Sequence, residues 1–333
     1  MTKEFRVGLI GFGFVGKGFV QVLRNRLHWI QEQYATKILL VGISTRSKGC
    51  IYSEQGLNLA DVGAWPGNRP LFQSYEQNWD SDQFLHNANL NAVVEVSPTD
   101  LSNPQVAYQH CITALNRGIH VLSANKGPVA RHYSELKGLA AEKGLHLGFE
   151  ATVMAGTPCV QVLETLKANG VKKILGVMNG TCNFILDQMG LGQPFDQALA
   201  EAQKRGYAEP DPSADIDGLD TLAKALILYR IAFDRDLESD KAQCKGIRNY
   251  PMVQVQQAKQ LGSRIKLIAD IRPEGVRILP QAFDINHPLS QISGATNGIL
   301  VETEDLGSVY LQGPGAGPKE TGSALIQDLV RIL

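Results

Sequence analysis

The segment from Gly206 to Lys224 holds the densest group of residues in this sequence that could do chemistry. Several acidic side chains come directly before a run that is otherwise apolar. Asp220 and Lys224 are four residues apart, so a helix would bring them to one face. A lysine on a largely buried helix is unfavourable unless it is paired or functional. Lys224 is therefore a candidate proton donor. The pattern leaves open an ordinary exposed ion pair, which would contribute about 0.3–0.5 kcal/mol.

A second group of residues has the spacing of a phosphate-binding turn. Gly11, Gly13 and Gly16 follow an apolar stretch and open a run with apolar residues at helical spacing. In this motif the first glycine permits a tight turn and the second lets the backbone approach a pyrophosphate, while the third allows close packing of helix on strand. The helix N-terminus then faces the phosphates. The sequence predicts a dinucleotide site, and the alternative is a glycine-rich turn without a ligand.

The residues after the second predicted strand bear on which dinucleotide would bind. A site for NAD usually has an acidic residue there to bind the ribose 2′-hydroxyl. Residues 44–48 read Ser-Thr-Arg-Ser-Lys, with no acid and with Arg46 and Lys48 beside hydroxyl groups. A 2′-phosphate carries about two negative charges and suits a guanidinium group. We therefore expect NADP(H) rather than NAD(H), and the alternative is a solvated basic loop.

The first half of the chain has the pattern of an α/β domain. Helical segments alternate with short apolar strands that are continuous hydrophobic runs, as expected when both faces of a parallel sheet are covered. This pattern predicts a doubly wound Rossmann nucleotide-binding domain over residues 1–150. The predicted strands are 6–10, 38–43, 92–96, 120–123 and 145–149, and the predicted helices include 104–117 and 133–143.

The second half has the sequence pattern of an α+β domain, which we place at residues 151–312. Strands are predicted at 174–178, 276–283 and 298–311, and helices at 195–204, 219–233 and 263–269. Residues 313–317 form a predicted tight loop, and 323–333 a closing helix. We expect the segment 313–333 to return to the first domain, because the apolar residues of that helix must be buried somewhere.

Composition limits the possible partners. The 333 residues contain 32 Lys+Arg and 33 Asp+Glu, so the net charge of −1 gives no electrostatic footprint for nucleic acid or a membrane surface. No apolar stretch reaches the roughly 20 residues of a membrane span, and the N-terminus has no signal-peptide core. The five cysteines have no Cys-x-x-Cys spacing and are expected to be buried, reduced thiols of a cytoplasmic protein.

The run from Gly206 to Lys224 resembles the signature of homoserine dehydrogenases, and the resemblance covers nearly the whole chain. It also includes residues 11–16, 123–128, 150–158, 179–181 and 313–317. Members of this family reduce L-aspartate 4-semialdehyde to L-homoserine with NAD(P)H. The resemblance implies a Rossmann domain joined to a mixed-sheet catalytic and dimerisation domain, a small-molecule substrate and a homodimer.

The resemblance also implies roles for individual residues. Lys224 would be the catalytic lysine with Asp220 as its partner, and Lys126 would lie near the nicotinamide and the reacting carbonyl. Which lysine is the acid stays open at this stage, and we favour Lys224. The substrate-binding candidates are Glu209, which would hold the amino group of the substrate, Thr181 and Asp215. The cofactor-binding candidates are Gly11, Gly13, Val15, Gly16, Arg46, Lys48, Ser97, Thr99, Lys126, Gly206 and Gly317.

Several members of the family bind a monovalent cation, usually sodium, at a loop like residues 150–157. The matching positions are Glu150, Val153, Ala155 and Thr157, of which the last three would use main-chain carbonyls. The alternative for Glu150 is a structural acid at a domain hinge. Ala155 stands where many relatives have glycine, and residues 319–321 stand where many have Pro-Thr-Ala.

The expected function is NADPH-dependent homoserine dehydrogenase, in the biosynthesis of threonine, methionine and isoleucine. One alternative is a related dehydrogenase acting on another amino or oxo acid. The other is a non-catalytic NADPH sensor, which would not need Glu209, Asp220 and Lys224 together. The sequence ends at Leu333, where longer relatives continue into a regulatory domain that binds threonine. We expect a short form of the enzyme, without feedback through such a domain.

Overall fold

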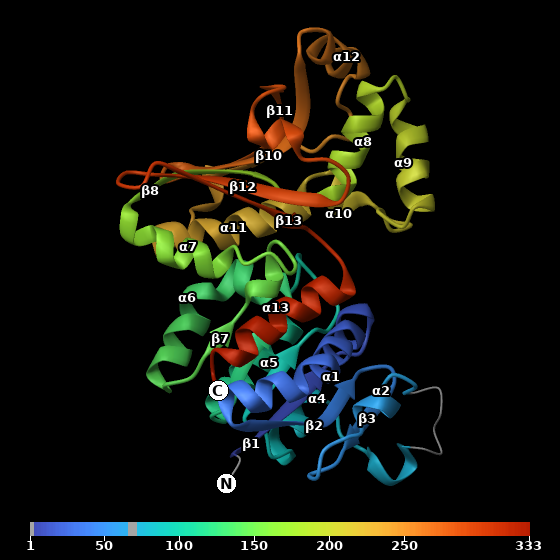
Figure 1. Cartoon of the computed structure of the whole chain (residues 1–333), viewed down its shortest axis with the longest axis vertical. Coiled ribbons are helices and arrows are strands. Elements are labelled where there is room, and N and C mark those ends of the chain that lie inside the picture. The colour runs from blue at the N-terminus through green and yellow to red at the C-terminus, as the bar shows by residue number, and fades with distance from the viewer. Residues whose placement is uncertain (1–2, 66–71) are drawn as a thin grey trace. The chain divides into compact units, whose positions relative to one another are not determined.

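The computed structural model describes residues 3–65 and 72–333, which form two compact units. One unit comprises Met1–Gly156 together with Gly317–Leu333, and the other comprises Thr157–Ala316. The first unit therefore combines the two ends of the chain (Figure 1). Each unit is built on one sheet, and the two sheets differ in strand direction.

A seven-stranded sheet in the order β4-β3-β2-β1-β5-β6-β7 forms the centre of the first unit. β2, β1, β5, β6 and β7 are parallel, β3 pairs antiparallel with β2, and β4 pairs antiparallel with β3. This arrangement confirms the predicted Rossmann-type domain, and the strand order changes direction between β1 and β5. The strands are β1 (Lys3–Ile10), β2 (Thr36–Thr45), β3 (Gly49–Tyr52), β4 (Glu76–Gln77), β5 (Ala92–Glu95), β6 (His120–Ser123) and β7 (Leu147–Gly148).

The helices of the first unit follow the strands in alternation. They are α1 (Phe14–Tyr34), α2 (Leu59–Val62), α4 (Ser81–Asn87), α5 (Gln105–Asn116), α6 (Lys126–Glu142) and α13 (Pro318–Val330), with 3₁₀ turns η1 (Gln73–Tyr75) and η2 (Glu150–Thr152). The predicted helix at 133–143 is longer than expected. It begins at Lys126, because the side chain of Asn125 accepts a hydrogen bond from the Gly127 amide and caps the helix.

Helices α1 and α13 pack against each other at two glycines. A Cβ atom on Gly18 would lie 2.0 Å from the Pro318 carbonyl oxygen, and one on Gly322 would lie 2.7 Å from the Phe19 amide nitrogen. The close approach buries Leu325 and Leu329 completely in the same cluster as Phe19. The chain's last helix thereby completes the hydrophobic core of the first unit.

A six-stranded mixed sheet in the order β13-β12-β8-β10-β11-β9 forms the second unit. Neighbouring strands are antiparallel, except that β9 is parallel to β11. Helices α7 and α11 lie together along one face of the sheet (Figure 1). The strands are β8 (Val171–Val177), β9 (Ala242–Cys244), β10 (Ser263–Arg272), β11 (Gly275–Asp284), β12 (Thr296–Thr303) and β13 (Ser308–Pro314). The helices are α7 (Val160–Leu166), α8 (Gly180–Gly190), α9 (Phe195–Lys204), α10 (Ser213–Ile216), α11 (Leu219–Phe233) and α12 (Met252–Gln260), with 3₁₀ turns η3 (Lys167–Asn169), η4 (Ser239–Lys241) and η5 (Pro288–Gln291).

Two predictions for this half were wrong. The helix expected at 263–269 is strand β10, which pairs residue by residue with β11 along its whole length. Residues 265–271 are buried on both sides of the strand, so the run lacks the alternation that would distinguish a strand from a buried helix. The single strand expected at 298–311 is the hairpin β12–β13, whose turn ends at Gly307 with a φ of 79°. Strand β13 also extends into the predicted loop, to Pro314.

The cysteine prediction was wrong at one position. All five cysteines are free thiols, but Cys244 is exposed, because it lies on the short edge strand β9. Cys50, Cys111, Cys159 and Cys182 are buried as expected. Burial raises the pKa of the Cys111 and Cys182 thiols well above the usual value, which keeps both protonated at neutral pH.

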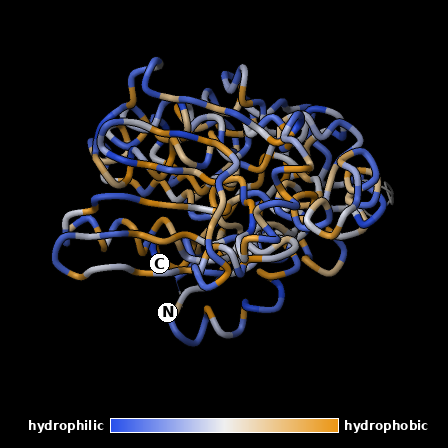
Figure 2. Tube along the Cα trace, turned by 90° about the horizontal axis from the view of Figure 1, so that it is seen from above, coloured by the Kyte–Doolittle hydropathy of each residue, from blue (hydrophilic) through white to orange (hydrophobic). Residues whose placement is uncertain are grey.

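Hydrophobic residues recur along the strands and helices of both units, whereas many of the outer loops are hydrophilic (Figure 2). Within residues 3–65 and 72–333, no helix is both long enough and apolar enough to cross a membrane.

The packing of α13 on α1 predicts that Gly18→Ala destabilises the protein. The added methyl group would overlap the Pro318 carbonyl, and such overpacking typically costs about 1–3 kcal/mol. The matched control is Gly138→Ala in the middle of α6, where a Cβ would have no atom within 4 Å. That change should stabilise the protein by about 0.5–1 kcal/mol, because alanine is the better helix former. Urea denaturation measures both, and equal midpoints for Gly18→Ala and the parent protein would refute the packing described here.

Candidate active site

A buried ion pair on helix α11 is the centre of the candidate site in the second unit. The Nζ atom of Lys224 lies 2.8 Å from Oδ2 of Asp220, with the two side chains 8% and 17% exposed. The spacing predicted that the two residues share a helix face, and they do. The exposed ion pair that the sequence left open is excluded by this burial.

The pair is attached to the end of strand β8. Lys224 Nζ donates a hydrogen bond of 2.7 Å to the main-chain carbonyl of Met178, the residue after the strand. The side-chain NH₂ group of Asn179 donates to Asp220 at 3.3 Å. The side-chain oxygen of Asn179 accepts a hydrogen bond from the main-chain amide of Cys182 at 2.8 Å. Asn179 thus caps helix α8 and binds the ion pair at the same time.

Asp215 and Thr181 extend the group of polar side chains. Asn179 donates to Oδ1 of Asp215 at 2.6 Å, and Thr181 Oγ1 lies 3.0 Å from Oδ2 of the same carboxyl group. Thr181 Oγ1 is also 2.6 Å from the Tyr207 carbonyl oxygen. Burial raises the pKa of Asp215, and the nearby charge of Asp220 raises it further. Two acids and one lysine therefore share a largely enclosed space.

The start of α11 sets the direction of these side chains. Gly218 precedes the helix with a φ of 85°, a left-handed conformation that most residues adopt only with strain. The turn places Asp220 in the first turn of the helix, where a negative charge interacts favourably with the helix dipole.

The other substrate-side candidates lie in the loop between α9 and α10. Glu209 is exposed, and its main-chain carbonyl accepts a hydrogen bond from the Gln203 side chain at 3.2 Å. Gly206 is also exposed and follows α9 with a φ of 75°. The structure therefore groups Thr181, Asp215, Asp220 and Lys224, while Glu209 stands apart from this group on a solvent-facing loop.

Three glycines of the first unit differ in what surrounds them. A Cβ on Gly11 would lie 2.4 Å from the Val96 carbonyl oxygen, and one on Gly16 would lie 2.9 Å from the Gly11 carbonyl oxygen. A Cβ on Gly13 would have no atom within 4 Å, and the neighbouring Phe14 is 85% exposed. The packing of the chain thus accounts for Gly11 and Gly16. Gly13 leaves an open approach to the N-terminus of α1, which fits a dinucleotide phosphate.

The basic residues after β2 belong to the hairpin turn between β2 and β3. Lys48 Nζ donates to the Phe12 carbonyl at 3.1 Å, so this cation lies against the glycine-rich turn. The Gly11 amide in turn donates to the Ser44 carbonyl at 2.9 Å. Arg46 is exposed on the same hairpin turn, which the antiparallel strand β3 creates and which the sequence did not predict.

The remaining candidates of the first unit lie at helix and strand ends. Ser97 and Thr99 follow β5, Lys126 is the first residue of α6, and Gly317 precedes α13 with a φ of 133°. Val15 lies in the first turn of α1 and is half-buried.

The positions proposed to hold a cation belong to both units: three to the first unit and one to the second. Glu150 is fully buried, and its amide donates to Asp328 at 2.9 Å. Val153 is buried, and Ala155 has a φ of 46°, a left-handed conformation that favours glycine. Thr157 belongs to the second unit, where its hydroxyl donates to the Pro314 carbonyl at 3.3 Å.

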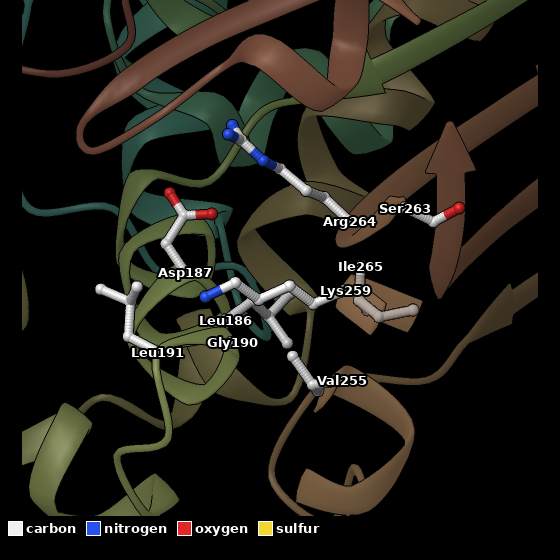
Figure 3. Close-up of a pocket in the computed structure, with 9 residues that line it drawn as sticks. All are labelled: Leu186, Asp187, Gly190, Leu191, Val255, Lys259, Ser263, Arg264 and Ile265. Carbon is white, nitrogen blue, oxygen red and sulfur yellow. The ribbon is translucent and has the colours of Figure 1, made fainter. Parts of the chain in front are cut away.

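The second unit has a pocket of about 240 Å³ (Figure 3). Its walls come from α8, α12 and β10, with the charged residues Asp187, Lys259 and Arg264 among apolar ones. Neither Asp220 nor Lys224 lines it. Behind it the fully buried Lys266 donates to Asp187 at 2.7 Å, which fixes α8 to the sheet.

Asn179 and the Met178 carbonyl are the contacts that sequence reasoning missed. Asn179 belongs to the segment 179–181 of the family resemblance, and an asparagine before a helix is a capping signal that could have identified it. The main-chain carbonyl that accepts from Lys224 could not be predicted, because any residue type could supply it.

The raised pKa of Asp215 predicts an unusual pH dependence of stability. A carboxyl group whose pKa is raised by folding contributes stability below the unfolded-state pKa of about 3.9, and this contribution is lost as the pH rises through the folded-state value. Asp215→Asn should therefore gain stability relative to the parent protein as the pH rises from about 4 towards 7.

Asp217 is the matched control for this experiment, because Arg248 lowers the pKa of Asp217. Its contribution is present above the unfolded-state pKa and is lost as the pH falls, so Asp217→Asn should lose stability relative to the parent as the pH rises. Urea denaturation at a series of pH values measures both differences. The same sign for the two variants would contradict this account of Asp215.

Two family models match the chain. Residues 158–330 match the model described as homoserine dehydrogenase, and residues 11–150 match the NAD-binding domain of homoserine dehydrogenase.

Individual relatives give the same result. The chain is 34% identical to a homoserine dehydrogenase of Methanocaldococcus jannaschii, over 97% of each chain. It is 32% identical to an NAD(+)-dependent homoserine dehydrogenase of Pseudomonas canavaninivorans, over 99% of this chain and 96% of the relative. A hyperthermophilic archaeal homoserine dehydrogenase solved in complex with NADPH has a TM-score of 0.86 and 28% identity, over 98% of this chain and 97% of that one. The chain belongs to the homoserine dehydrogenase family of NAD(P)-dependent oxidoreductases.

Proposed function

We propose that this protein reduces L-aspartate 4-semialdehyde to L-homoserine, with NADPH as the source of the hydride. The single observation that carries the proposal is the buried ammonium group of Lys224. Two of its three N–H groups point at Asp220 and the Met178 carbonyl. Within residues 3–65 and 72–333 no contact uses the third, which is therefore available to an oxygen atom of a substrate.

The reduction of an aldehyde adds a hydride to the carbon atom and a proton to the oxygen atom. The reduced nicotinamide supplies the hydride when it is bound. The Lys224 ammonium stabilises the negative charge that develops on the oxygen and donates the proton. Asp220 holds the Lys224 ammonium in place and stabilises its positive charge in this buried environment. Lys126, at the start of α6, is the second lysine that the family resemblance implies for the reaction.

The substrate is a zwitterionic amino acid, so its ammonium group needs an acidic partner. Asp215 is the best placed of the acids, because Asn179 and Thr181 hold it beside the ion pair. Asp220 is engaged with Lys224, and Glu209 is on an exposed loop. We therefore assign the ammonium to Asp215 in place of Glu209, to which the family resemblance assigned it.

The preference for NADPH is supported by the hairpin turn after β2. No acid follows the strand, and Lys48 lies against the glycine-rich turn. Arg46, exposed on the same turn, is available to a 2′-phosphate. The family contains both a relative named NAD(+)-dependent and a structure with NADPH, so membership alone does not decide between them.

The proposal also includes a cytoplasmic homodimer, a place in threonine, methionine and isoleucine biosynthesis, and a sodium ion held by Glu150, Val153, Ala155 and Thr157. These parts rest on the family resemblance.

Replacement of Lys224 tests the proposed chemistry. Lys224→Met should lower kcat for aspartate semialdehyde by about 10²–10⁴-fold, the usual contribution of a general acid, with the Kd for NADPH nearly unchanged. The matched control is Lys173→Met, which removes a partly buried lysine paired with Glu302 in the same unit and should keep its kcat. NADPH absorbance measures turnover. Full activity of Lys224→Met would exclude this lysine as the acid, and equal loss of turnover and cofactor binding would point to a role in folding.

The same assay separates the competing functions. Turnover of another oxo acid, but not of aspartate semialdehyde, would favour a related dehydrogenase. Tight binding of NADPH without turnover of any substrate would favour a sensor.

The cofactor preference is tested with Arg46→Ala. Loss of a charge-assisted contact to the 2′-phosphate should weaken NADPH binding by about ten- to a hundredfold and leave NADH binding unchanged. Arg24→Ala, on the outer face of α1, is the control and should change neither. The parent protein should bind NADPH more tightly than NADH by a similar factor. Equal affinities in the parent, with no effect of Arg46→Ala, would contradict the preference.

A further inference from the structure

A glutamate side chain is buried at the carboxyl end of strand β5. Glu95 has no exposed surface, and it ends a strand whose other residues, Ala92, Val93 and Val94, are apolar and buried. A buried carboxylate is strongly unfavourable unless several donors satisfy it, and an apolar residue would be the more stabilising choice for such a position. The acid at this position therefore points to a role other than the packing of the strand.

Glu95 is held by donors from two directions. The Ser97 amide donates to Oε1 at 2.8 Å, and the Ser97 hydroxyl donates to the same oxygen. Nδ1 of His110, on helix α5, lies 2.6 Å from Oε2. A histidine ring nitrogen that carries its proton can donate to a carboxyl oxygen. The carboxylate thus closes the turn after β5 and ties it to α5.

The network continues from this turn to helix α6. The side-chain amide of Asn125 lies 3.3 Å from the Ser97 carbonyl and 3.4 Å from the Pro98 carbonyl. Its side-chain oxygen accepts from the Gly127 amide at 3.2 Å and so caps the helix that starts at Lys126. Glu95 therefore determines the position of Ser97 directly and that of Lys126 through Asn125.

The turn that Glu95 closes lies against the glycine-rich turn. A Cβ on Gly11 would be 2.4 Å from the Val96 carbonyl oxygen and 2.7 Å from the Ser97 amide nitrogen. β1 and β5 are also the strands between which the sheet order changes direction. In doubly wound sheets dinucleotides bind in the crevice outside the carboxyl ends of the strands at this point. The network thus borders the dinucleotide site, although its acid faces away from solvent.

We propose that Glu95 is a positioning residue for the nicotinamide half of the cofactor. It fixes the turn of Val96, Ser97 and Pro98 and the start of α6, so that Ser97 and Lys126 are held in place before the cofactor binds. The inference rests on the proposed function insofar as that function places a nicotinamide dinucleotide on the first unit. Preorganised groups of this kind reduce the ordering that binding and hydride transfer would otherwise require.

Glu95→Gln tests the proposal, because it keeps the shape of the side chain and removes its charge. Two probes are compared by titration: NADPH, and 2′-phospho-ADP-ribose, which has the phosphates and ribose but lacks nicotinamide. We expect the Kd for NADPH to rise about tenfold and the Kd for 2′-phospho-ADP-ribose to change by less than about twofold. A purely structural role would move both constants together or neither, and either result would overturn the proposal.

The control is Thr113→Val on α5, the helix that also carries His110. Thr113 is buried and donates to Asp82 at 3.3 Å, away from Glu95, so its loss should lower stability and leave the ratio of the two constants unchanged. If Glu95→Gln does not fold, His110→Phe serves instead, because it removes one hydrogen-bond partner of the same carboxyl group. It should raise the Kd for NADPH more than the Kd for 2′-phospho-ADP-ribose, by a smaller factor than Glu95→Gln. Equal changes for the two probes in that variant would also overturn the proposal.

A kinetic measurement separates this proposal from the proposed function. With NADPH deuterated at the transferred position, Glu95→Gln should lower kcat and raise the primary isotope effect, because misplacement of the nicotinamide slows hydride transfer. An unchanged isotope effect with full kcat would contradict the role. If the parent protein does not reduce aspartate semialdehyde, the proposed function fails, while the binding comparison still decides the role of Glu95.

Discussion

The ion pair between Asp220 and Lys224, attached to the Met178 carbonyl, is the interaction on which the candidate site depends. A buried ammonium needs acceptors in fixed places, because each unsatisfied N–H group in a poorly hydrated setting is unfavourable by more than a typical hydrogen bond stabilises. The acceptors come from the first turn of α11 and from the end of β8. The requirement to satisfy one charge therefore determines how a helix and a strand of the second unit meet.

The same requirement explains the residues around the pair. Asn179 supplies donors to Asp220 and Asp215 and also caps α8, so the position of one amide links two acids to the start of a helix. Burial raises the pKa of Asp215, and repulsion from the nearby Asp220 raises this pKa further. Such closely placed acids are tolerated where a cation lies between them or where a ligand will supply one. This arrangement supports the proposal that a positively charged amino group binds here beside a proton donor.

In the first unit, glycines and one buried acid hold the turns and helices around the predicted cofactor site in position. Gly11 lets the turn after β1 approach the turn after β5, and Glu95 holds the second turn rigid from behind. Gly18 and Gly322 allow α13 to cover α1, so the last helix of the chain supports the helix whose N-terminus we propose as the phosphate site. In both units the groups expected to meet ligands are held by partners that do not meet them.

Much of this could be predicted from the sequence where the signal is local. The spacing of Gly11, Gly13 and Gly16 after an apolar strand predicted the Rossmann-type domain, and the four-residue spacing of Asp220 and Lys224 predicted their pairing. The strand β10 was mistaken for a helix, because its residues are buried on both faces and only pairing with β11 reveals its type. The partners of Glu95 could not be predicted, since His110 reaches it from a separate helix. The Met178 carbonyl could not be predicted either, because every residue has a main-chain carbonyl and the residue type does not indicate which one is used.

The most direct measurement of the central claim is a crystal structure of the protein with oxidised cofactor and L-homoserine. The account predicts that the hydroxyl oxygen of homoserine lies within about 2.6–3.2 Å of Lys224 Nζ, the distance over which a proton can be transferred, while Asp220 still contacts the same nitrogen. A hydroxyl group bound by another donor, with the Lys224 ammonium beyond hydrogen-bonding distance, would contradict it.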